Sequence, residues 1–370
     1  MRIEYLKLFH FRNYERLEWK PNPGTTVIIG KNGSGKTNIL EAVHFSCFAR
    51  SHRTKQDKDL MRIGEPYTSV QVKTERVTGK HDVELKLRHV GKTHKQAYVY
   101  GKKTERISEM FGHSTCVLFA PEDLEIIKDS PLERRRFLDM QISQMRYRYL
   151  NELTEYHKAL KNRNILLKNA QIGMNVDREL DVWEEQMCIQ GAEVVRQRQW
   201  FLQYLNEVAS EIYKDLSPNS KEKFSLNYAG QFKDEDTPYL ALERNLKNNR
   251  GADIRRATTG FGPHKDDIDF RLNHHLMKEY ASQGQMRTAV LSVKLAMIKI
   301  IRAEMGDLPV LLLDDVFSEL DVRRREALLA HIEGIQSIIT CTDKSDIQGA
   351  KVDQFLYVEN QNGVAHVVEE

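Results

Sequence analysis

The 370-residue chain is long enough for two or three structural units with their own cores, so its stability does not depend on disulfides. The four cysteines lie far apart and form no CxxC pair, which excludes a zinc knuckle or disulfide framework and favours a reducing, cytoplasmic compartment. The net charge of +3 permits a nucleic-acid partner without indicating one, and neither a signal peptide nor an apolar stretch of membrane-spanning length is present.

The N-terminal third is predicted to consist mainly of strands, because apolar residues nearly alternate in segments such as IEYLKLFHF, SVQVKTERV and VELKLRHV. One helix interrupts these strands and begins after the glycines near residue 35. From Leu132 to Leu167 apolar residues recur every three or four positions, which predicts one long amphipathic helix. A second helical run from Trp183 to Ile212 predicts an antiparallel helical hairpin.

The remaining chain falls into a polar stretch and a second strand-rich part. Residues 217–256, which include SPNSKEK, GQFKDEDTP and KNNRGAD, are predicted to form loops and exposed turns. Buried or half-buried strands are predicted at PVLLLDDV, SIITCT and QFLYVEN, so strands and helices alternate again in the last third.

The strongest local signal is a complete GxxxxGK[ST] pattern between a predicted strand and a predicted helix. Its residues are Gly30, Lys31, Asn32, Gly33, Ser34, Gly35, Lys36 and Thr37. Glycines let backbone N–H groups close around phosphates, and the helix N-terminus adds positive charge. Lys36 supplies charge at the β- and γ-phosphates, and the Thr37 hydroxyl can bind Mg²⁺. The strand and helix on either side favour an ATP and Mg²⁺ site over a glycine-rich turn with an incidental lysine.

Two acidic residues end the apolar strand that begins at Val310. Asp314 is the candidate Mg²⁺ ligand beside the P-loop, and Asp315 could orient or activate the attacking water. Paired acids at a strand end are also common in turns and helix N-caps, but a complete P-loop in the same chain favours the catalytic interpretation.

Two further segments carry polar groups near predicted helices. Ser282, Gly284 and Gln285 of the SQGQ segment precede a long apolar-periodic helix, where they could bind a phosphate or simply cap the helix. The SELD segment, which ends at Asp321, follows the acidic strand by two residues.

This ordered set resembles the ABC-type ATPases, and its details resemble the RecF family of bacterial DNA repair proteins. The segments that carry the resemblance are FRNY, GKNGSGKTNILEAV, RSHR, FAPEDLEIIKDSPLERRRFLD, TGFGPHKDDIDF, SQGQMR and DDVFSELD. It extends over nearly the whole chain and is weakest in the helical hairpin and the polar stretch.

The resemblance implies an α/β fold, namely an ABC-type P-loop ATPase head with a mixed sheet and a second, mainly helical lobe. Residues 1–128 and 300–370 would form the two parts of the ATPase lobe. Residues 129–299 would form the helical lobe, including the SQGQ segment.

ABC-type ATPases hold two ATP molecules between two head-to-tail subunits. By resemblance, Lys36, Thr37 and Asp314 would act on the ATP of their own subunit, whereas Ser282 and Gly284 would act on that of the neighbour. Gln285 is a further candidate ATP-binding residue. Asp321 would lie near the seam between subunits, and residues 340–343 would hold the γ-phosphate sensor. Segment 119–123 is a candidate for the loop that joins the two lobes, although it lacks the expected glutamine.

Two residues depart from the broad ABC pattern. Gln283 replaces a usual glycine, and Asp315 stands where most relatives have glutamate. The shorter side chain would hold its carboxylate farther from the attacking water, so we expect slow hydrolysis and ATP acting as a timer.

Basic clusters are candidate DNA contacts, although charged residues on helices are more often solvated faces. The candidates are Arg134, Arg135 and Arg136, then Arg53 with its neighbours Arg50 and His52, and the pair Arg255 and Arg256. Arg12 and Arg53 could contact nucleotide instead. No sequence-reading DNA motif is present, so recognition of DNA backbone and shape is expected.

The resemblance implies an ATP-dependent homodimer that acts at gapped or single-strand/double-strand DNA in repair, replication and the SOS response, helping to load a recombinase together with RecR and RecO mediator proteins. One alternative is a nucleic-acid-processing ATPase with its own nuclease activity, which would need an acidic metal cluster beyond Asp314 and Asp315. Another is a chromosome-tethering protein of the long coiled-coil type, for which the hairpin is too short.

Overall fold

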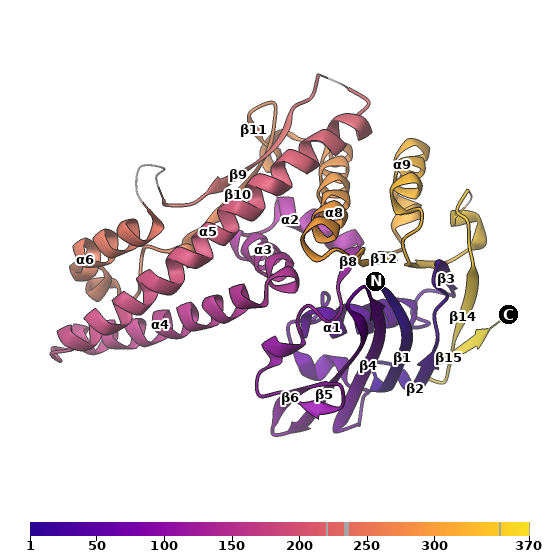
Figure 1. Cartoon of the computed structure of the whole chain (residues 1–370), viewed down its shortest axis with the longest axis horizontal. Coiled ribbons are helices and arrows are strands. Elements are labelled where there is room, and N and C mark those ends of the chain that lie inside the picture. The colour runs from indigo at the N-terminus through magenta and orange to yellow at the C-terminus, as the bar shows by residue number, and fades with distance from the viewer. Residues whose placement is uncertain (220, 233–236, 348, 370) are drawn as a thin grey trace. The chain divides into compact units, whose positions relative to one another are not determined.

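The computed structural model describes residues 1–219, 221–232, 237–347 and 349–369. Contacts divide the chain into two compact units, which are shown within Figure 1. Unit 1 consists of residues 1–124, 211–220 and 283–370, and unit 2 consists of residues 125–210 and 221–282. Residues 220 and 233–236 of the predicted polar stretch lie outside the described residues.

Unit 1 contains a six-stranded mixed sheet with the strand order β15-β14-β3-β13-β12-β8. The strands are β3 (Thr25–Ile29), β8 (Cys116–Phe119), β12 (Val310–Asp314), β13 (Ser337–Cys341), β14 (Gln354–Gln361) and β15 (Val364–Glu369). Only the β14–β15 pair is antiparallel. Strands β12 and β13 are buried along their whole length, and β12 accordingly reads as an apolar run that ends in Asp314. The carboxyl ends of β3, β12 and β13 therefore meet at one edge of the sheet.

A second sheet of unit 1 is antiparallel, with the order β2-β1-β4-β5-β6-β7. Its strands are β1 (Arg2–Phe11), β2 (Tyr14–Trp19), β4 (Tyr67–Arg76), β5 (Gly79–Val90), β6 (Lys92–Val99) and β7 (Lys102–Lys103). Buried and more exposed residues alternate from Arg16 to Trp19 of β2 and along the central part of β5, as expected for a sheet with one face on a core. The strands predicted from this alternation are confirmed.

Helices complete unit 1. The longer ones are α1 (Lys36–Phe48), α8 (Gln283–Met305) and α9 (Val322–Ile332), and the short ones are η1 (Asp57–Leu60), η2 (Ile107–Met110), η3 (Pro121–Leu124), η5 (Val316–Glu319) and η6 (Lys344–Ile347). Helix α1 begins where the P-loop ends and is buried at most of its positions, so the loop is fixed between a buried strand and a buried helix.

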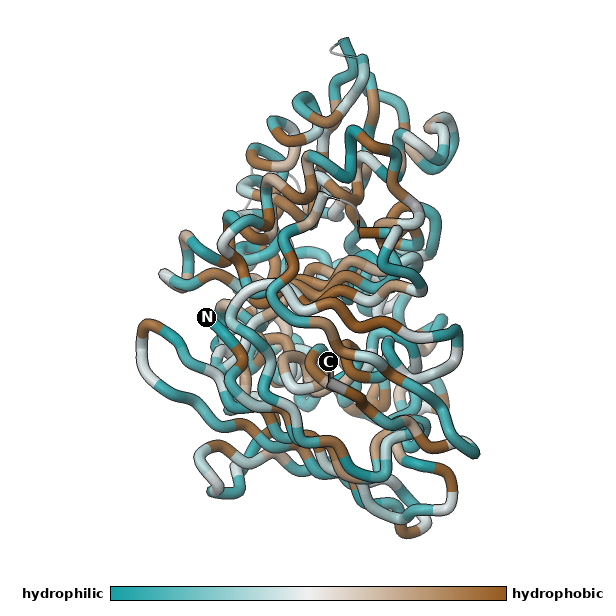
Figure 2. The backbone as a smooth tube through the Cα atoms, turned by 90° about the vertical axis from the view of Figure 1, so that its right-hand side faces the viewer, coloured by the Kyte–Doolittle hydropathy of each residue, from teal (hydrophilic) through white to brown (hydrophobic). Residues whose placement is uncertain are grey.

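Unit 2 is mainly helical and carries a three-stranded sheet of order β11-β10-β9. Its elements are α2 (Glu125–Lys128), α3 (Pro131–Met145), α4 (Tyr147–Gln171), α5 (Asp177–Leu216), whose last turn belongs to unit 1, β9 (Phe224–Ala229), α6 (Pro238–Arg256), η4 (Pro263–Lys265), β10 (Asp267–Leu272), β11 (His275–Leu276) and α7 (Met277–Tyr280). Along the long helices in the upper part of Figure 2, brown hydrophobic residues recur among teal hydrophilic ones. An α/β head with a mixed sheet and a mainly helical second lobe is therefore confirmed.

The prediction of one helix from Leu132 to Leu167 was wrong, because the helix is broken at Arg146. Arg146 has a non-helical backbone (φ −132°, ψ 89°) between α3 and α4. Its guanidinium lies 3.5 Å from the centre of the Trp200 ring and donates a 2.6 Å hydrogen bond to Gln197. These contacts with α5 stabilise the bend, and the apolar spacing continues across it.

The prediction of loops throughout residues 217–256 was also wrong. Strand β9 pairs with β10, and α6 covers the second half of the stretch. Thr237 caps α6 by accepting a hydrogen bond from the backbone of Leu240, and Pro238 occupies the first turn. Burial of Leu242 and Leu246 stabilises a helix whose other positions are largely polar.

No helix among the described residues combines the length and the hydropathy that crossing a bilayer requires.

Candidate nucleotide site

The P-loop joins β3 to α1 and depends on its glycines for two different reasons. Gly33 and Gly35 have φ values of +78° and +120°, where a side chain would be strained. A Cβ on Gly30 would lie 2.6 Å from the Ser34 hydroxyl oxygen and closer still to the carbonyl oxygen of Val358. The backbone can therefore turn tightly and leave its N–H groups close to a bound phosphate.

The FRNY segment holds the P-loop from one side. The Asn13 amide donates a 2.9 Å hydrogen bond to the carbonyl of Ser34, and the Tyr14 hydroxyl donates a 3.1 Å bond to the carbonyl of Gly35. Burial raises the pKa of Tyr14, so the phenol remains a donor at neutral pH. No role had been predicted for Asn13 or Tyr14, although the FRNY segment was part of the family resemblance.

Lys36 and Ser34 present the polar groups of the loop. Lys36 is only 4% exposed, and its ammonium donates hydrogen bonds of 2.6 and 3.2 Å to the carbonyls of Gly30 and Lys31. The Ser34 hydroxyl is buried and has no hydrogen-bond partner within the described part of the chain. A buried donor without a partner is costly, so the loop is suited to an anionic ligand that accepts this bond.

Asp314 connects the P-loop to the neighbouring strand ends. Its Oδ1 accepts hydrogen bonds from the hydroxyls of Thr37 (2.9 Å) and Thr340 (2.7 Å). This places one carboxylate and two hydroxyl oxygens together, and oxygen ligands are those that Mg²⁺ prefers. The predicted pair Thr37 and Asp314 is thus brought together at the sheet edge, and the structure adds Thr340.

Asp315 follows with a left-handed backbone (φ 49°, ψ 21°), a conformation that is uncommon for residues other than glycine. Its N–H donates a 3.0 Å hydrogen bond to the Thr340 hydroxyl, and its carbonyl accepts a 2.7 Å bond from the Ser318 hydroxyl. The surrounding bonds therefore fix the peptide that directs the Asp315 side chain. Uncommon backbone conformations of this kind recur at functional sites.

The SQGQ and SELD segments are joined by Arg324, a residue for which no role had been predicted. The Arg324 guanidinium donates to the Gly284 carbonyl (3.1 Å) and to the Thr288 hydroxyl (2.7 and 2.9 Å), and it pairs with Asp321. Asp321 also accepts a 2.9 Å bond from the Arg324 backbone as the N-cap of α9. Ser282 is exposed immediately before α8. Arg324 thereby fixes SELD relative to the first turn of α8.

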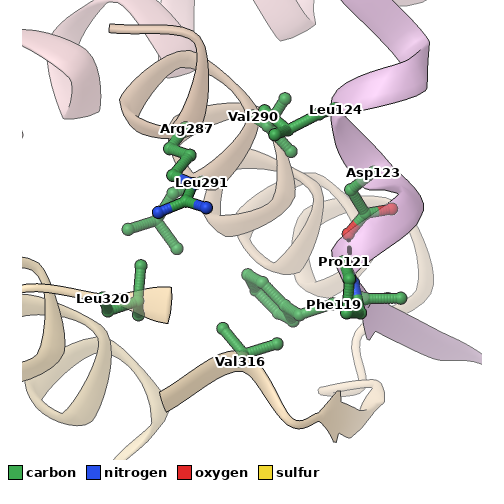
Figure 3. Close-up of a pocket in the computed structure, with 10 residues that line it drawn as sticks. Phe119, Pro121, Asp123, Leu124, Arg287, Val290, Leu291, Val316 and Leu320 are labelled. Carbon is green, nitrogen blue, oxygen red and sulfur yellow. Dashed lines mark hydrogen bonds between the residues drawn. The ribbon is translucent and has the colours of Figure 1, made fainter. Parts of the chain in front are cut away.

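Segment 119–123 lines a small, mostly apolar pocket of about 50 Å³ together with residues of α8 and η5 (Figure 3). Lys294 of α8 holds this segment by donating to Asp123 (2.6 Å) and to the carbonyl of Leu118 (2.7 Å). Asp123 in turn accepts a 2.8 Å bond from the Ala120 N–H, drawn as the dashed line in Figure 3. The segment is therefore anchored to the helix that follows SQGQ.

The predicted DNA contacts Arg134, Arg135 and Arg136 all have partners inside unit 2. Arg134 is 4% exposed and donates two hydrogen bonds, of 2.6 and 2.9 Å, to the Asp267 carboxylate. Arg135 donates a 2.6 Å bond to the carbonyl of Asp266, and Arg136 pairs with Glu133. A phosphate contact by Arg134 would require it to leave Asp267.

Arg53 lies beside the P-loop helix. Its guanidinium donates a 3.0 Å hydrogen bond to Asn38 and lies 3.6 Å from the Glu41 carboxylate. Arg12 binds the same Glu41 through two hydrogen bonds of 2.6 and 2.8 Å. Both arginines therefore stand near the nucleotide loop, and Arg53 is the more exposed of the two.

Comparisons with known proteins agree with the geometry of this site. The family model described as the RecF/RecN/SMC N terminal domain matches residues 2–366. The DNA replication and repair protein RecF of Clostridium perfringens is 39% identical over 347 residues, with 94% of each chain covered. The same protein of Clostridium botulinum is 38% identical over 372 residues, covering 99% of this chain and all of the relative.

Solved structures give the same result. The recombination mediator protein RecF in complex with ATP, described as part of the RecFOR pathway, is 31% identical with a TM-score of 0.90, and the similarity covers 99% of this chain and 97% of that one. An Smc head bound to the C-winged helix domain of ScpA is 17% identical with a TM-score of 0.58, which shows a shared fold alone.

Proposed function

Because the chain belongs to the RecF family of DNA replication and repair proteins, we propose that it binds ATP and uses the nucleotide to control its association with DNA. The observation that carries this proposal is the joining of the P-loop, through Thr37, to Asp314 and Thr340 at one sheet edge. A glycine-rich turn without a nucleotide would not need this arrangement.

The residues fit ATP and Mg²⁺. The P-loop offers backbone N–H groups, the buried Ser34 hydroxyl and the Lys36 ammonium to the phosphates. Thr37 and Asp314 would hold the magnesium ion, which when bound neutralises charge on the β- and γ-phosphates. Lys36 would exchange its present carbonyl partners for phosphate oxygens.

Hydrolysis is proposed to be slow. Asp315 would orient the attacking water and accept its proton, and its backbone is fixed by Thr340 and Ser318. An aspartate reaches about one methylene less far than a glutamate, and an ångström of misplacement can lower a rate by about 100-fold. ATP would thus set how long an assembled state lasts.

We propose that this state is a homodimer in which Ser282, Gly284, Gln285 and Asp321 of each subunit face the ATP of the other. The Arg324 contacts support this proposal, because they hold Gly284 and Asp321 as one surface. The dimer would bind DNA backbone at gaps or single-strand/double-strand junctions and help to load a recombinase. The RecFOR pathway, named for the solved relatives, makes RecO and RecR mediator proteins the proposed partners.

The nuclease alternative has no observation in its favour. It would require a further acidic metal site, and the described residues contain no group of three or more His, Cys, Asp or Glu side chains placed to hold a metal ion.

The first test separates the roles of the two acids. Asp314→Asn is expected to abolish Mg²⁺-dependent hydrolysis, whereas Asp315→Asn should still bind ATP but stall before hydrolysis. Lys36→Arg should weaken ATP use, and Glu105→Gln, an exposed acid outside the site, serves as the charge-matched control. Binding of a fluorescent ATP analogue and phosphate release are measured on each variant. Normal turnover in Asp314→Asn would refute the assignment.

The second test addresses assembly. Sedimentation is measured with and without ATP and DNA, and ATP is expected to convert monomers into dimers that bind duplex DNA. Ser282→Arg would place a bulky cation against the neighbour's phosphates, so this variant should bind ATP yet remain monomeric. Normal ATP-driven dimerisation of Ser282→Arg would mean that Ser282 only precedes a helix.

A further inference from the structure

Within unit 2, helix α4 lies beside the end of α6 and the TGFGPHK residues (259–265) that follow it. The two stretches of chain run in opposite directions. Gln171 donates a 3.1 Å hydrogen bond to the carbonyl of Arg255, and Asn164 accepts bonds of 2.9 and 2.8 Å from the backbone and hydroxyl of Thr259. At the other end, the Tyr156 hydroxyl lies 2.7 Å from His264 Nδ1. Three contacts spread along α4 therefore fix one continuous seam.

The acidic residues of this segment are turned inward. Asp253 is 2% exposed and pairs at 2.8 Å with Arg163, a fully buried residue of α4. Asp266 is 1% exposed and lies 3.3 Å from the guanidinium of Arg198 on α5. Buried arginines thus neutralise the negative charges on the inside of the seam.

The basic residues of the seam are turned outward. We call Lys161, Lys168, Arg255, Arg256 and Lys265 the basic seam, and all five are exposed. The described residues supply none of their side chains with a hydrogen bond or an ion-pair partner. Asp266 and Asp267, which follow Lys265 in the chain, are paired with Arg198 and Arg134. The five exposed cations therefore create a local positive potential, although the net charge of the whole chain is only +3.

The α4 side of the seam is also hollowed. A depression of about 420 Å³ is lined by His157, Leu160, Lys161, Asn164, Ile165 and Lys168. Lys161 and Lys168 are seven residues apart on one helix face, so they stand about 10 Å apart along the axis. Burial lowers the pKa of His264 to about 4, and the charges of Lys265 and Arg135 act in the same direction.

We propose that the basic seam binds the phosphate backbone of duplex DNA. This proposal rests on the proposed function, which makes DNA the partner, and adds the surface that holds it. A duplex carries one negative charge per about 1.7 Å of its axis, so a row of exposed cations neutralises several phosphates at once. Exposed lysine and arginine side chains supply the charge for phosphate contacts, which position a duplex and carry no sequence information directly.

The buried Arg163 and Arg198 hold the TGFGPHK segment in place. Arg163 also donates a 2.7 Å bond to the Thr259 hydroxyl, and Arg198 donates a 2.6 Å bond to the carbonyl of Pro263. The TGFGPHK backbone is thereby held from α4 and from α5, which keeps Lys265 at a fixed place beside α4.

The test uses a triple variant of the full chain, Lys161→Gln, Lys168→Gln and Lys265→Gln. The matched control is Lys92→Gln, Lys102→Gln and Lys103→Gln, three exposed lysines of unit 1 with the same charge change. Binding of a fluorescently labelled duplex is measured by anisotropy with ATP at several salt concentrations. Each lost phosphate contact should lower the slope of log K against log salt by about 0.9, and three contacts weaken binding by roughly 100-fold at 0.15 M salt. The control variant should keep the wild-type slope.

The outcomes distinguish this proposal from the proposed function. The wild type could bind DNA under ATP control while the seam variant keeps the wild-type slope of log K against log salt. The proposal that the basic seam binds DNA would then be wrong, and the proposed function would stand. If the wild type does not bind DNA, both fail. Equal losses in the seam and control variants would show a general charge effect and also overturn the seam. A separate competition experiment adds poly-glutamate of the same total charge as the duplex. If poly-glutamate at equal concentration displaces the duplex from the wild type, the basic seam is a binding site for acidic proteins and not for DNA.

Discussion

Removing one hydroxyl at Thr340 is expected to loosen both acidic residues of the nucleotide site. Thr340 is 1% exposed, and its hydroxyl donates to Asp314 at 2.7 Å while accepting from the Asp315 N–H at 3.0 Å. Valine has nearly the same shape, so Thr340→Val replaces the hydroxyl by a methyl group and removes two hydrogen bonds.

The magnitude follows from the two bonds. A hydrogen bond to a charged group contributes about 1.5–3 kcal/mol, and leaving a buried N–H without a partner costs about 1–3 kcal/mol. The added methyl offsets about 0.8 kcal/mol by burial. The free energy of unfolding should therefore fall by roughly 2–5 kcal/mol. Hydrolysis should slow by about tenfold or more, because Asp314 keeps only Thr37 to orient it.

The assay can isolate unit 1. Trp19 is the tryptophan of unit 1, and the other two, Trp183 and Trp200, belong to unit 2. In a background with phenylalanine at 183 and 200, tryptophan fluorescence during urea unfolding reports unit 1. Thr340→Ser keeps the hydroxyl and should lose only about 1 kcal/mol. If Thr340→Val is as stable and active as Thr340→Ser, the hydroxyl does not hold the two acids.

Three further outcomes are expected. Arg163→Met should lower the free energy of unfolding by about 3–5 kcal/mol, because it leaves the buried Asp253 carboxylate without its ion-pair partner, whereas Glu184 keeps Arg250. Asp253→Asn in the same variant should recover part of that loss, and full stability of Arg163→Met in urea would contradict this. Arg324→Ala should weaken ATP-driven dimerisation, measured by sedimentation, while ATP binding by the monomer stays unchanged. Arg324→Lys should restore little of the dimerisation, because lysine lacks the planar guanidinium that bonds Gly284 and Thr288 together. Lowering the pH from about 6.5 towards 4 should destabilise unit 2, because the pKa of His264 is about 4 in the folded state and the unfolded chain takes up the proton at a higher pH. His264→Gln should therefore flatten the pH dependence of the urea midpoint.

Local patterns were sufficient for much of the fold and for part of the nucleotide site. The P-loop, the buried strands and Asp314 are recognisable because their chemistry lies in contiguous residues: glycines before a lysine, or an apolar run that ends in an acid. Parallel pairing then brings Asp314 beside Thr37 of the P-loop, where the candidate Mg²⁺ ligand was predicted.

The missing parts depend on partners that are distant in sequence. The bend at Arg146 is stabilised by Trp200, and no proline or glycine marks it. The roles of Thr340 and Arg324 exist only after β13 lies beside β12 and α9 lies beside α8. Thr237 and Pro238 are typical of a helix start, but the residues around them are mostly polar, a composition that is typical of loops.

The position of β3 determines when during synthesis a nucleotide pocket can form. Its two neighbours in the sheet, β13 and β14, lie about 300 residues later in the chain. At about 5–20 residues per second, the strand leading into the P-loop waits roughly 15–60 s on the ribosome for a partner. The antiparallel sheet needs only residues up to 103, and unit 2 is fully translated by residue 282. A nascent chain therefore completes its ATP pocket last, and any product that stops before Ser337 lacks both strands that flank β3.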